Sequence, residues 1–324
     1  MAKYKSYKSQ TQVPDKYASR KRRMDGEQVV RSSKFSYEEQ SHQAGFEDSI
    51  SALFGIPGIG KSMFAAELGL ALKEKYHLPY SGTYFIQVDP INHSRSIRMN
   101  IGEDGKPVLT DTWPTFRKFV DDAESDPEFV KTVKMWVIDT LDGLVPKGIS
   151  TICSDFGITD LREATRKIGN DGWSAEAWQE LKYELRYQIL RLAAIGPGVL
   201  LLSHERYRKV QEGGLEVEKA SMDVSNSIYN ALGNDCSIIM RMRLESGRAK
   251  KPSKSTPRCL AVLSSLDEDA KENLGVITDK YENGIVPFTT EREAVDKILA
   301  CFGTVKTSQK VSKKTVKRPK KVRR

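Results

Sequence analysis

The sequence predicts an α/β fold with a mainly parallel, twisted sheet that helices cover on both faces. Short apolar runs typical of buried strands alternate with longer segments whose apolar residues recur at helical spacing. This alternation is characteristic of parallel sheets, whose strands are buried on both sides. The 324 residues are 39% hydrophobic and show no internal repeat, so the chain is long enough to bury one substantial core.

The predicted elements follow one another from residue 49 to residue 301. Strands are expected at 49–54, 82–88, 135–138, 198–202, 237–244 and 259–263. Helices are expected from Lys61 through Leu72, at 115–122, 174–194 and 223–232, and from the capping box of Thr290 and Glu293 to Cys301. The other long segments are expected to be connections, namely 146–173 with a helical stretch at 161–168, and a polar loop at 207–222.

Charge divides the chain into three parts. The formal charge of +9 combines +7 in residues 1–24, +10 in residues 304–324 and −8 in the residues between them. Because neither end offers an apolar face, we expect disordered basic arms at 1–44 and 302–324 around a folded core at 45–301. A flexible polycation suits a polyanion, so nucleic acid is the expected partner. A tail that serves only solubility is the alternative.

Several classes of protein are excluded by composition. No apolar run approaches the length of a membrane span, and the N-terminal residues lack the apolar stretch of a secretory signal. The arms also lack the aromatic or leucine face of a helix that lies on a membrane surface. The four cysteines are far apart and form no CxxC pair, which argues against a zinc site or a disulfide scaffold and favours the cytoplasm.

A phosphate-binding motif follows the first predicted strand. The pattern G-x-x-x-x-G-K-[ST] is matched at every fixed position by the segment Gly55, Ile56, Pro57, Gly58, Ile59, Gly60, Lys61 and Ser62, in which the residues from Ile56 to Ile59 fill the variable positions. Glycines allow consecutive backbone N–H groups to face an anion at a helix N-terminus. We therefore expect ATP at this segment and at the following Met63, with Lys61 on the β- and γ-phosphates and Ser62 on Mg²⁺. A chance glycine-rich turn is the alternative.

The second half of such a site is an acid at the end of a neighbouring buried strand. The apolar run 135–138 ends at Asp139, about 75–80 residues after the phosphate motif, which is the spacing expected of a neighbouring strand. A carboxylate in this place supplies the hard oxygen that the hydrated magnesium ion prefers. Asp139 is therefore the second predicted magnesium residue.

With these two motifs the chain resembles the RecA-like branch of P-loop ATPases over residues 45–290. It looks most similar to the small phage-borne members associated with single-strand annealing and recombination. The resemblance implies that Asp89, which ends the second strand where the family has a longer acid, is the catalytic base. A turn cap before Pro90 is the alternative, and Glu205 is the next candidate base. It also implies that His204 senses the γ-phosphate, and a hydrogen-bonded histidine without this role is the alternative.

The resemblance extends to residues that act between subunits and on DNA. Related hexameric helicases carry a K-x-R-x-G finger that reaches the neighbour's nucleotide. Lys280 and Gly284 match this pattern, but Glu282 stands where the arginine belongs. Lys280 is thus a candidate finger or a solvated turn residue, and Arg241 or Arg243 is the fallback.

Residues 207–222 fall where the family has its second DNA-binding loop. They contain Arg208, Lys209 and Lys219, but also glutamates that argue against direct DNA contact. The segment 137–147 is similar to the one that leads into the first such loop.

These features together predict a Mg²⁺-dependent ATPase that acts on DNA in recombination, annealing or repair. The expected partners are single-stranded DNA and further copies of the chain in a ring or filament, in the cytoplasm of a bacterial host. The alternatives are a ring helicase or packaging motor, and a slow nucleotide-binding switch or loader. A small-molecule kinase is disfavoured because no arginine-rich lid segment is found.

Overall fold

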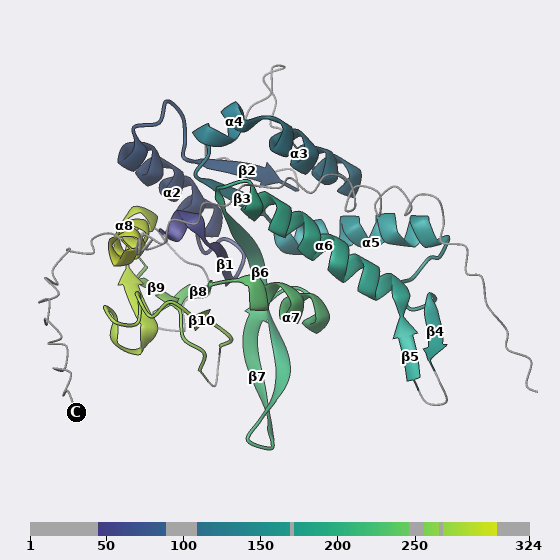
Figure 1. Cartoon of the computed structure of the whole chain (residues 1–324). Helices are drawn as coiled ribbons and strands as arrows, with labels where there is room; N and C mark the ends of the chain where they lie inside the picture. The colour runs from purple at the N-terminus through teal and green to yellow at the C-terminus, as the bar shows by residue number, and fades with distance from the viewer. Residues whose placement is uncertain (1–44, 89–108, 169–171, 246–255, 266–267, 303–324) are drawn as a thin grey trace, which may run out of the picture. The chain divides into compact units, whose positions relative to one another are not determined.

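The computed structural model describes residues 45–88, 109–168, 172–245, 256–265 and 268–302 (Figure 1). In these residues the main sheet has nine strands, and five of them form a parallel centre in the order β8-β1-β6-β3-β2. Strands β9 and β11 extend one edge in antiparallel fashion. The strands are β1 (Ile50–Gly55), β2 (Thr83–Gln87), β3 (Met135–Asp139), β6 (Gly198–Glu212), β7 (Leu215–Met222), β8 (Ile238–Leu244), β9 (Arg258–Ala261), β10 (Lys271–Glu272) and β11 (Ile285–Phe288).

Helices cover both faces of this sheet, as Figure 1 shows. Helices α2 and α8 pack on one face, while α3, α5, α6 and α7 pack on the other, and each face has its own apolar core. The predicted α/β fold with a mainly parallel sheet is thereby confirmed. The helices are α2 (Lys61–Tyr76), α3 (Trp113–Ser125), α4 (Pro127–Thr132), α5 (Leu141–Phe156), α6 (Glu176–Ala194), α7 (Asn226–Asp235) and α8 (Glu291–Phe302), with short 3-10 turns η1 (Phe46–Asp48) and η2 (Glu282–Gly284).

The central strands are apolar on both sides because both sides are covered. In β1, Leu53 packs into the core beneath α2 and α8, whereas Phe54 packs into the core beneath α5 and α6. Both side chains are fully buried. This explains why the strand reads as a continuous apolar run rather than as an alternating one. Its position in the middle of the sheet fixes the place where the phosphate motif begins.

The segment 146–173 differs from the predicted connection. Helix α5 covers most of its first half and ends at Gly157, whose φ of +65° is left-handed. Gly148 lies inside this helix, where α5 packs against α6. A Cβ at this position would come within 2.9 Å of the Leu181 side chain on α6, so a glycine is required. The glycine therefore serves close helix packing rather than a loop. The predicted helical stretch at 161–168 is also wrong, since β4 (Thr165–Ile168) pairs with β5 (Gly172–Ala175) in a separate two-stranded sheet.

The predicted polar loop at 207–222 is a β-hairpin. Strand β6 continues far beyond the sheet centre to Glu212, and β7 returns alongside it in antiparallel register. Gly213 and Gly214, with φ values of +57° and +83°, make the two-residue turn between them. The hairpin projects below the sheet in Figure 1. Its polar character reflects exposed strand faces rather than a lack of secondary structure.

The helices in the described part of the chain do not include one with the length and apolar character needed to cross a membrane. The predicted basic arms lie outside the described residues, apart from Phe302 at the end of α8, and so does Asp89.

Candidate functional site

The phosphate motif forms a tight turn between the end of β1 and the start of α2. Gly58 and Gly60 have φ values of +76° and +119°, a region that favours glycine. Ile59 is fully buried in the core beneath α2 and α8, and thereby anchors the turn. Gly55 lies directly against the Met242 carbonyl of β8, where a Cβ could not fit. The glycines are therefore required by backbone shape and close approach.

Lys61 is the first residue of α2 and points back into the turn. Its ammonium donates hydrogen bonds to the carbonyl oxygens of Gly55 at 2.8 Å and Ile56 at 3.1 Å. Burial lowers the pKa of Lys61 to about 8, against the raising influence of Asp142, Asp139 and Glu205. A buried cation that is bound mainly by neutral carbonyls is well placed to receive an anion.

Asp139 ends β3, next to β6, and meets the phosphate motif through Ser62. The Ser62 hydroxyl is hydrogen-bonded to the Asp139 carboxylate. Burial raises the pKa of Asp139, although the Ser62 hydrogen bond and the charge of Lys61 both act to lower it. The sequence-predicted Lys61, Ser62 and Asp139 thus lie together at the carboxyl edge of the sheet.

Ser62 and Asp139 also have the chemistry that Mg²⁺ requires. Hydroxyl and carboxylate oxygens are hard ligands, and Mg²⁺ is typically held by one or two such groups together with water and substrate phosphates. In the described residues no group of three or more His, Cys, Asp or Glu could hold a metal without such help. The pair therefore fits a magnesium ion that arrives with a nucleotide.

His204 is held beside this edge by Asp142, a residue that sequence reasoning did not assign. The two oxygens of the Asp142 carboxylate accept from the His204 backbone N–H at 2.8 Å and bond to the ring Nδ1 at 2.7 Å. Burial would raise the pKa of Asp142, but the hydrogen bonds from His204 outweigh it and lower the pKa. An ionised carboxylate only accepts, so Nδ1 carries the proton and Nε2 is left for another partner.

A family model of the AAA domain matches residues 49–272, which is more than half of the chain. The chain belongs to the AAA domain family. No curated protein sequence matches it. The AAA domain points to a P-loop ATPase that binds nucleotide, usually with Mg²⁺, in agreement with the motif at residues 55–62. The match ends before Lys280 and α8.

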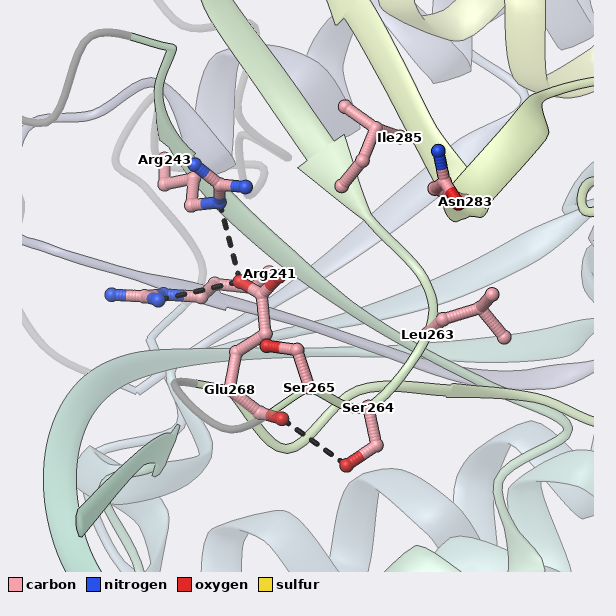
Figure 2. A pocket seen from close by; sticks show the side chains of 8 residues that line it. All are labelled: Arg241, Arg243, Leu263, Ser264, Ser265, Glu268, Asn283 and Ile285. Carbon is pink, nitrogen blue, oxygen red and sulfur yellow. Dashed lines mark hydrogen bonds and ion pairs between the residues drawn. The ribbon is translucent and has the colours of Figure 1, made fainter. Parts of the chain in front are cut away.

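The two arginines predicted as fallback fingers lie in a second cluster of charged side chains. Arg241 on β8 bonds to Glu205 at 3.1 Å and to Glu268 at 3.3 Å. Arg243 also bonds to Glu268, at 3.3 Å, and lines a cavity of about 430 Å³ (Figure 2). Only 10% of the Arg241 side chain is exposed, against 35% for Arg243. Of the two, Arg243 is therefore the one that could reach outward without leaving a buried position.

Lys280 lies away from the phosphate motif. Its ammonium donates to the Ala300 carbonyl at 3.4 Å, near the C-terminal end of α8. Glu291, which lies against Gly60 of the phosphate motif, is at the other end of that helix. At 1.5 Å per residue, the two ends are about 13 Å apart along the helix axis. A role for Lys280 at the nucleotide would thus have to be played on a neighbouring subunit.

The basic side chains of the β6–β7 hairpin have partners of their own. Arg208 forms an ion pair with Asp269 and lies over the Tyr229 ring. Lys209 pairs with Glu216 at 2.7 Å, and Lys219 donates to the Ser264 hydroxyl at 3.2 Å. Contact of this hairpin with DNA stays a prediction, and these pairs would have to be exchanged for phosphates.

Proposed function

We propose that this AAA domain protein is a Mg²⁺-dependent ATPase of the RecA-like type that acts on single-stranded DNA as a homo-oligomer, as the phage-borne annealing and recombination ATPases do. The observation that carries the ATPase part is the group formed by Lys61, Ser62 and Asp139 around a turn of glycine backbone. Such a group offers a cation and a helix N-terminus to an anion, and two hard oxygens to the metal ion that accompanies it.

The chain's own residues have separate roles in this proposal. Lys61 exchanges its bonds to Gly55 and Ile56 for the β- and γ-phosphate oxygens, while Ser62 and Asp139 hold the metal. Bound magnesium would supply charge neutralisation at the phosphates. Asp142 orients His204 so that Nε2 faces the γ-phosphate. Asp89 is the proposed proton acceptor, because the alternative, Glu205, is already bound to Arg241.

A comparison of two lysines on α2 tests the ATPase proposal. Lys61→Ala should abolish phosphate release while the fold survives, because Lys61 contacts the phosphates and adds little to the apolar core. Lys73→Ala is the matched control, since Lys73 lies on the same helix about 18 Å further along its axis. Phosphate release by the full chain at saturating ATP is the measurement. An unchanged kcat in Lys61→Ala would contradict the assignment.

Two carboxylates separate binding from hydrolysis. Asp139→Asn should weaken both Mg²⁺-dependent ATP binding and turnover. Asp89→Asn should leave ATP bound and slow hydrolysis only, because a base acts in the transition state. Titration calorimetry with MgATP, read beside kcat, distinguishes the two. If Asp89→Asn turns over at the wild-type rate, the base is another residue.

The nucleic-acid part of the proposal rests on charge. Residues 304–324 carry ten Lys and Arg, next to a body with a formal charge of −8. Replacing all ten with Gln keeps the length and should reduce the slope of log K against log salt by several units if most of them meet phosphates. Titration of a fluorescent single-stranded oligonucleotide at several salt concentrations measures this. Coinciding slopes would mean that the segment serves solubility only, and an RNA oligonucleotide in parallel tests the choice of nucleic acid.

A ring motor is the second candidate, and the exposure of Arg243 is the observation that favours it. If Arg243 acts on a neighbour's nucleotide, Arg243→Gln and Lys61→Ala proteins should each be inactive alone. Mixing them should restore part of the turnover, because the intact site of one chain would then receive the intact arginine of the other. Absence of recovery in co-assembled mixtures excludes this role for Arg243.

A further inference from the structure

The phosphate motif is contacted from outside by a buried arginine. Arg258 is the first residue of β9, opposite Leu244 at the end of β8, and thus lies at the same edge of the sheet as the motif. Its Nη1 donates to the Ile59 carbonyl at 2.8 Å. Only 5% of the Arg258 side chain is exposed. The backbone of the phosphate motif therefore has a buried hydrogen-bond donor that comes from β9.

A second residue holds this arginine in place. Nη1 of Arg258 also donates to Glu291 Oε1 at 2.6 Å, and Nη2 donates to the Thr289 carbonyl at 2.8 Å. Glu291 is the first residue of α8, outside the segment that matches the AAA domain. Both side chains lie directly against Gly60, where an added Cβ would be 2.5 Å from Glu291 Oε1 and 2.7 Å from Arg258 Nη1.

The orientation of one peptide follows from these contacts. The C=O of Ile59 and the N–H of Gly60 belong to the same trans peptide and so point in opposite directions. With the carbonyl bound to Arg258, the Gly60 N–H faces away from the arginine. In phosphate motifs of this kind, backbone amides are the groups that meet phosphate. Because Gly60 has a permissive backbone, this peptide could otherwise rotate.

We propose that Arg258 and Glu291 form a bracket that holds the Ile59–Gly60 peptide in the orientation required for nucleotide binding. Both are positioning residues: they contact the backbone of the phosphate motif and act on the nucleotide through it. This inference rests on the proposed nucleotide site. It goes beyond that site by making α8 a part of it, since α8 also packs on α2, the helix that follows the phosphate motif.

The first test is the affinity of the full chain for MgADP, measured by calorimetry. Arg258→Gln should weaken binding roughly 10-fold or more, as expected when a charge-assisted hydrogen bond is lost. Arg258→Lys should not restore it, because a lysine cannot reproduce the forked contacts to Ile59, Glu291 and Thr289. Glu291→Gln changes a more exposed side chain and should weaken binding by a smaller factor. It tests the bracket independently if the Arg258 variants fail to fold.

Arg292→Gln is the matched control. It removes a neighbouring arginine of α8 that also has two acidic partners, Glu74 and Asp296, without touching the phosphate motif. Its MgADP affinity should stay within about 2-fold of wild type, because exposed ion pairs contribute little. Equal losses in Arg258→Gln and Arg292→Gln, or full recovery in Arg258→Lys, would overturn the bracket.

Hydrogen exchange of the nucleotide-free protein separates the bracket from the proposed function. Amides of residues 55–62 should exchange faster in Arg258→Gln than in wild type and in Arg292→Gln, because the bracket acts before nucleotide arrives. If wild type binds no MgADP but this exchange difference is present, the ATPase proposal fails and the bracket stands. If the exchange rates coincide, the bracket fails whatever the nucleotide affinity.

Discussion

Two buried cations near the carboxyl end of β1 are held by different kinds of oxygen. Lys61 is bound by the neutral carbonyls of Gly55 and Ile56. Arg241, on the neighbouring strand β8, is bound by the carboxylates of Glu205 and Glu268. The first cation lacks a bonded counter-ion among the described residues, whereas the second has two.

The two pKa values move in opposite directions for this reason. Burial lowers the pKa of Lys61 to about 8 because carbonyl dipoles only partly replace water. Burial also acts to lower the pKa of Arg241, but the hydrogen bonds and charge of Glu205, with the charge of Glu268, outweigh it and raise the pKa. A cation without a bonded counter-ion is suited to bind an anion, and a cation that is paired with carboxylates is suited to support the fold.

The largest expected effect is the loss of stability when Arg241 is removed. Arg241→Met leaves Glu205 and Glu268 buried without their main cation, which should lower the free energy of unfolding by about 3–5 kcal/mol. Urea denaturation followed by circular dichroism measures this change. The triple variant with Glu205→Gln and Glu268→Gln should recover most of the loss, because the buried charges then disappear together. A loss below about 1 kcal/mol in Arg241→Met would show that water already solvates these carboxylates.

In contrast to Arg241, the charged form of Lys61 should lower the free energy of unfolding, and this effect should depend on pH. Its folded pKa of about 8 lies below the ordinary value of 10.5, so between these pH values the unfolded chain binds more protons than the folded one. Stability therefore rises with pH across this window, by on the order of 3 kcal/mol in total. The measurement is the free energy of unfolding of wild type minus that of Lys61→Met from pH 7 to 11, which removes the contribution of other groups.

Saturating MgADP provides the control for this pH dependence. In the proposed site, phosphate oxygens would replace the carbonyls as partners of Lys61 and keep it charged, so the rise between pH 8 and 10.5 should disappear. A difference that is flat with pH in the free protein would mean that Lys61 keeps its ordinary pKa. The contrast with Arg241 would then be lost.

The sequence predicted the parts of this site that are contiguous in the chain. The order of glycines, Lys61 and Ser62 between a strand and a helix is a local pattern, and it needs no long-range contact to be recognised. Asp139 could be predicted because an acid after a buried strand has a known place at the edge of a parallel sheet. These predictions concern residues whose chemistry and position are both set by neighbours in sequence.

The residues that sequence reasoning missed depend on contacts between distant segments. Asp142 becomes informative only when β6 places His204 beside it, and Arg258 only when β9 lies next to β8. The sequence predicts a loop at 207–222 because the strands of the hairpin carry charges on exposed faces, which hide the strand period. It predicts a connection from residue 146 onward because the pattern does not show that Gly148 serves helix packing.

The smallest expected effect is that of Arg243, which shares Glu268 with Arg241 and differs mainly in exposure. Arg243→Gln should lower the free energy of unfolding by less than about 1 kcal/mol, because a pair that water reaches gains little from its charges. In the Arg241→Met background, however, Arg243 is the remaining arginine bound to Glu268, and its removal should then be more costly. Urea denaturation of the two single variants and the double variant gives this coupling directly. Additive losses would mean that Glu268 does not link the two arginines. A positive coupling would show that a single buried carboxylate sets the contribution of both arginines, a property that separates this cluster from Lys61, which has no carboxylate bonded to it among the described residues.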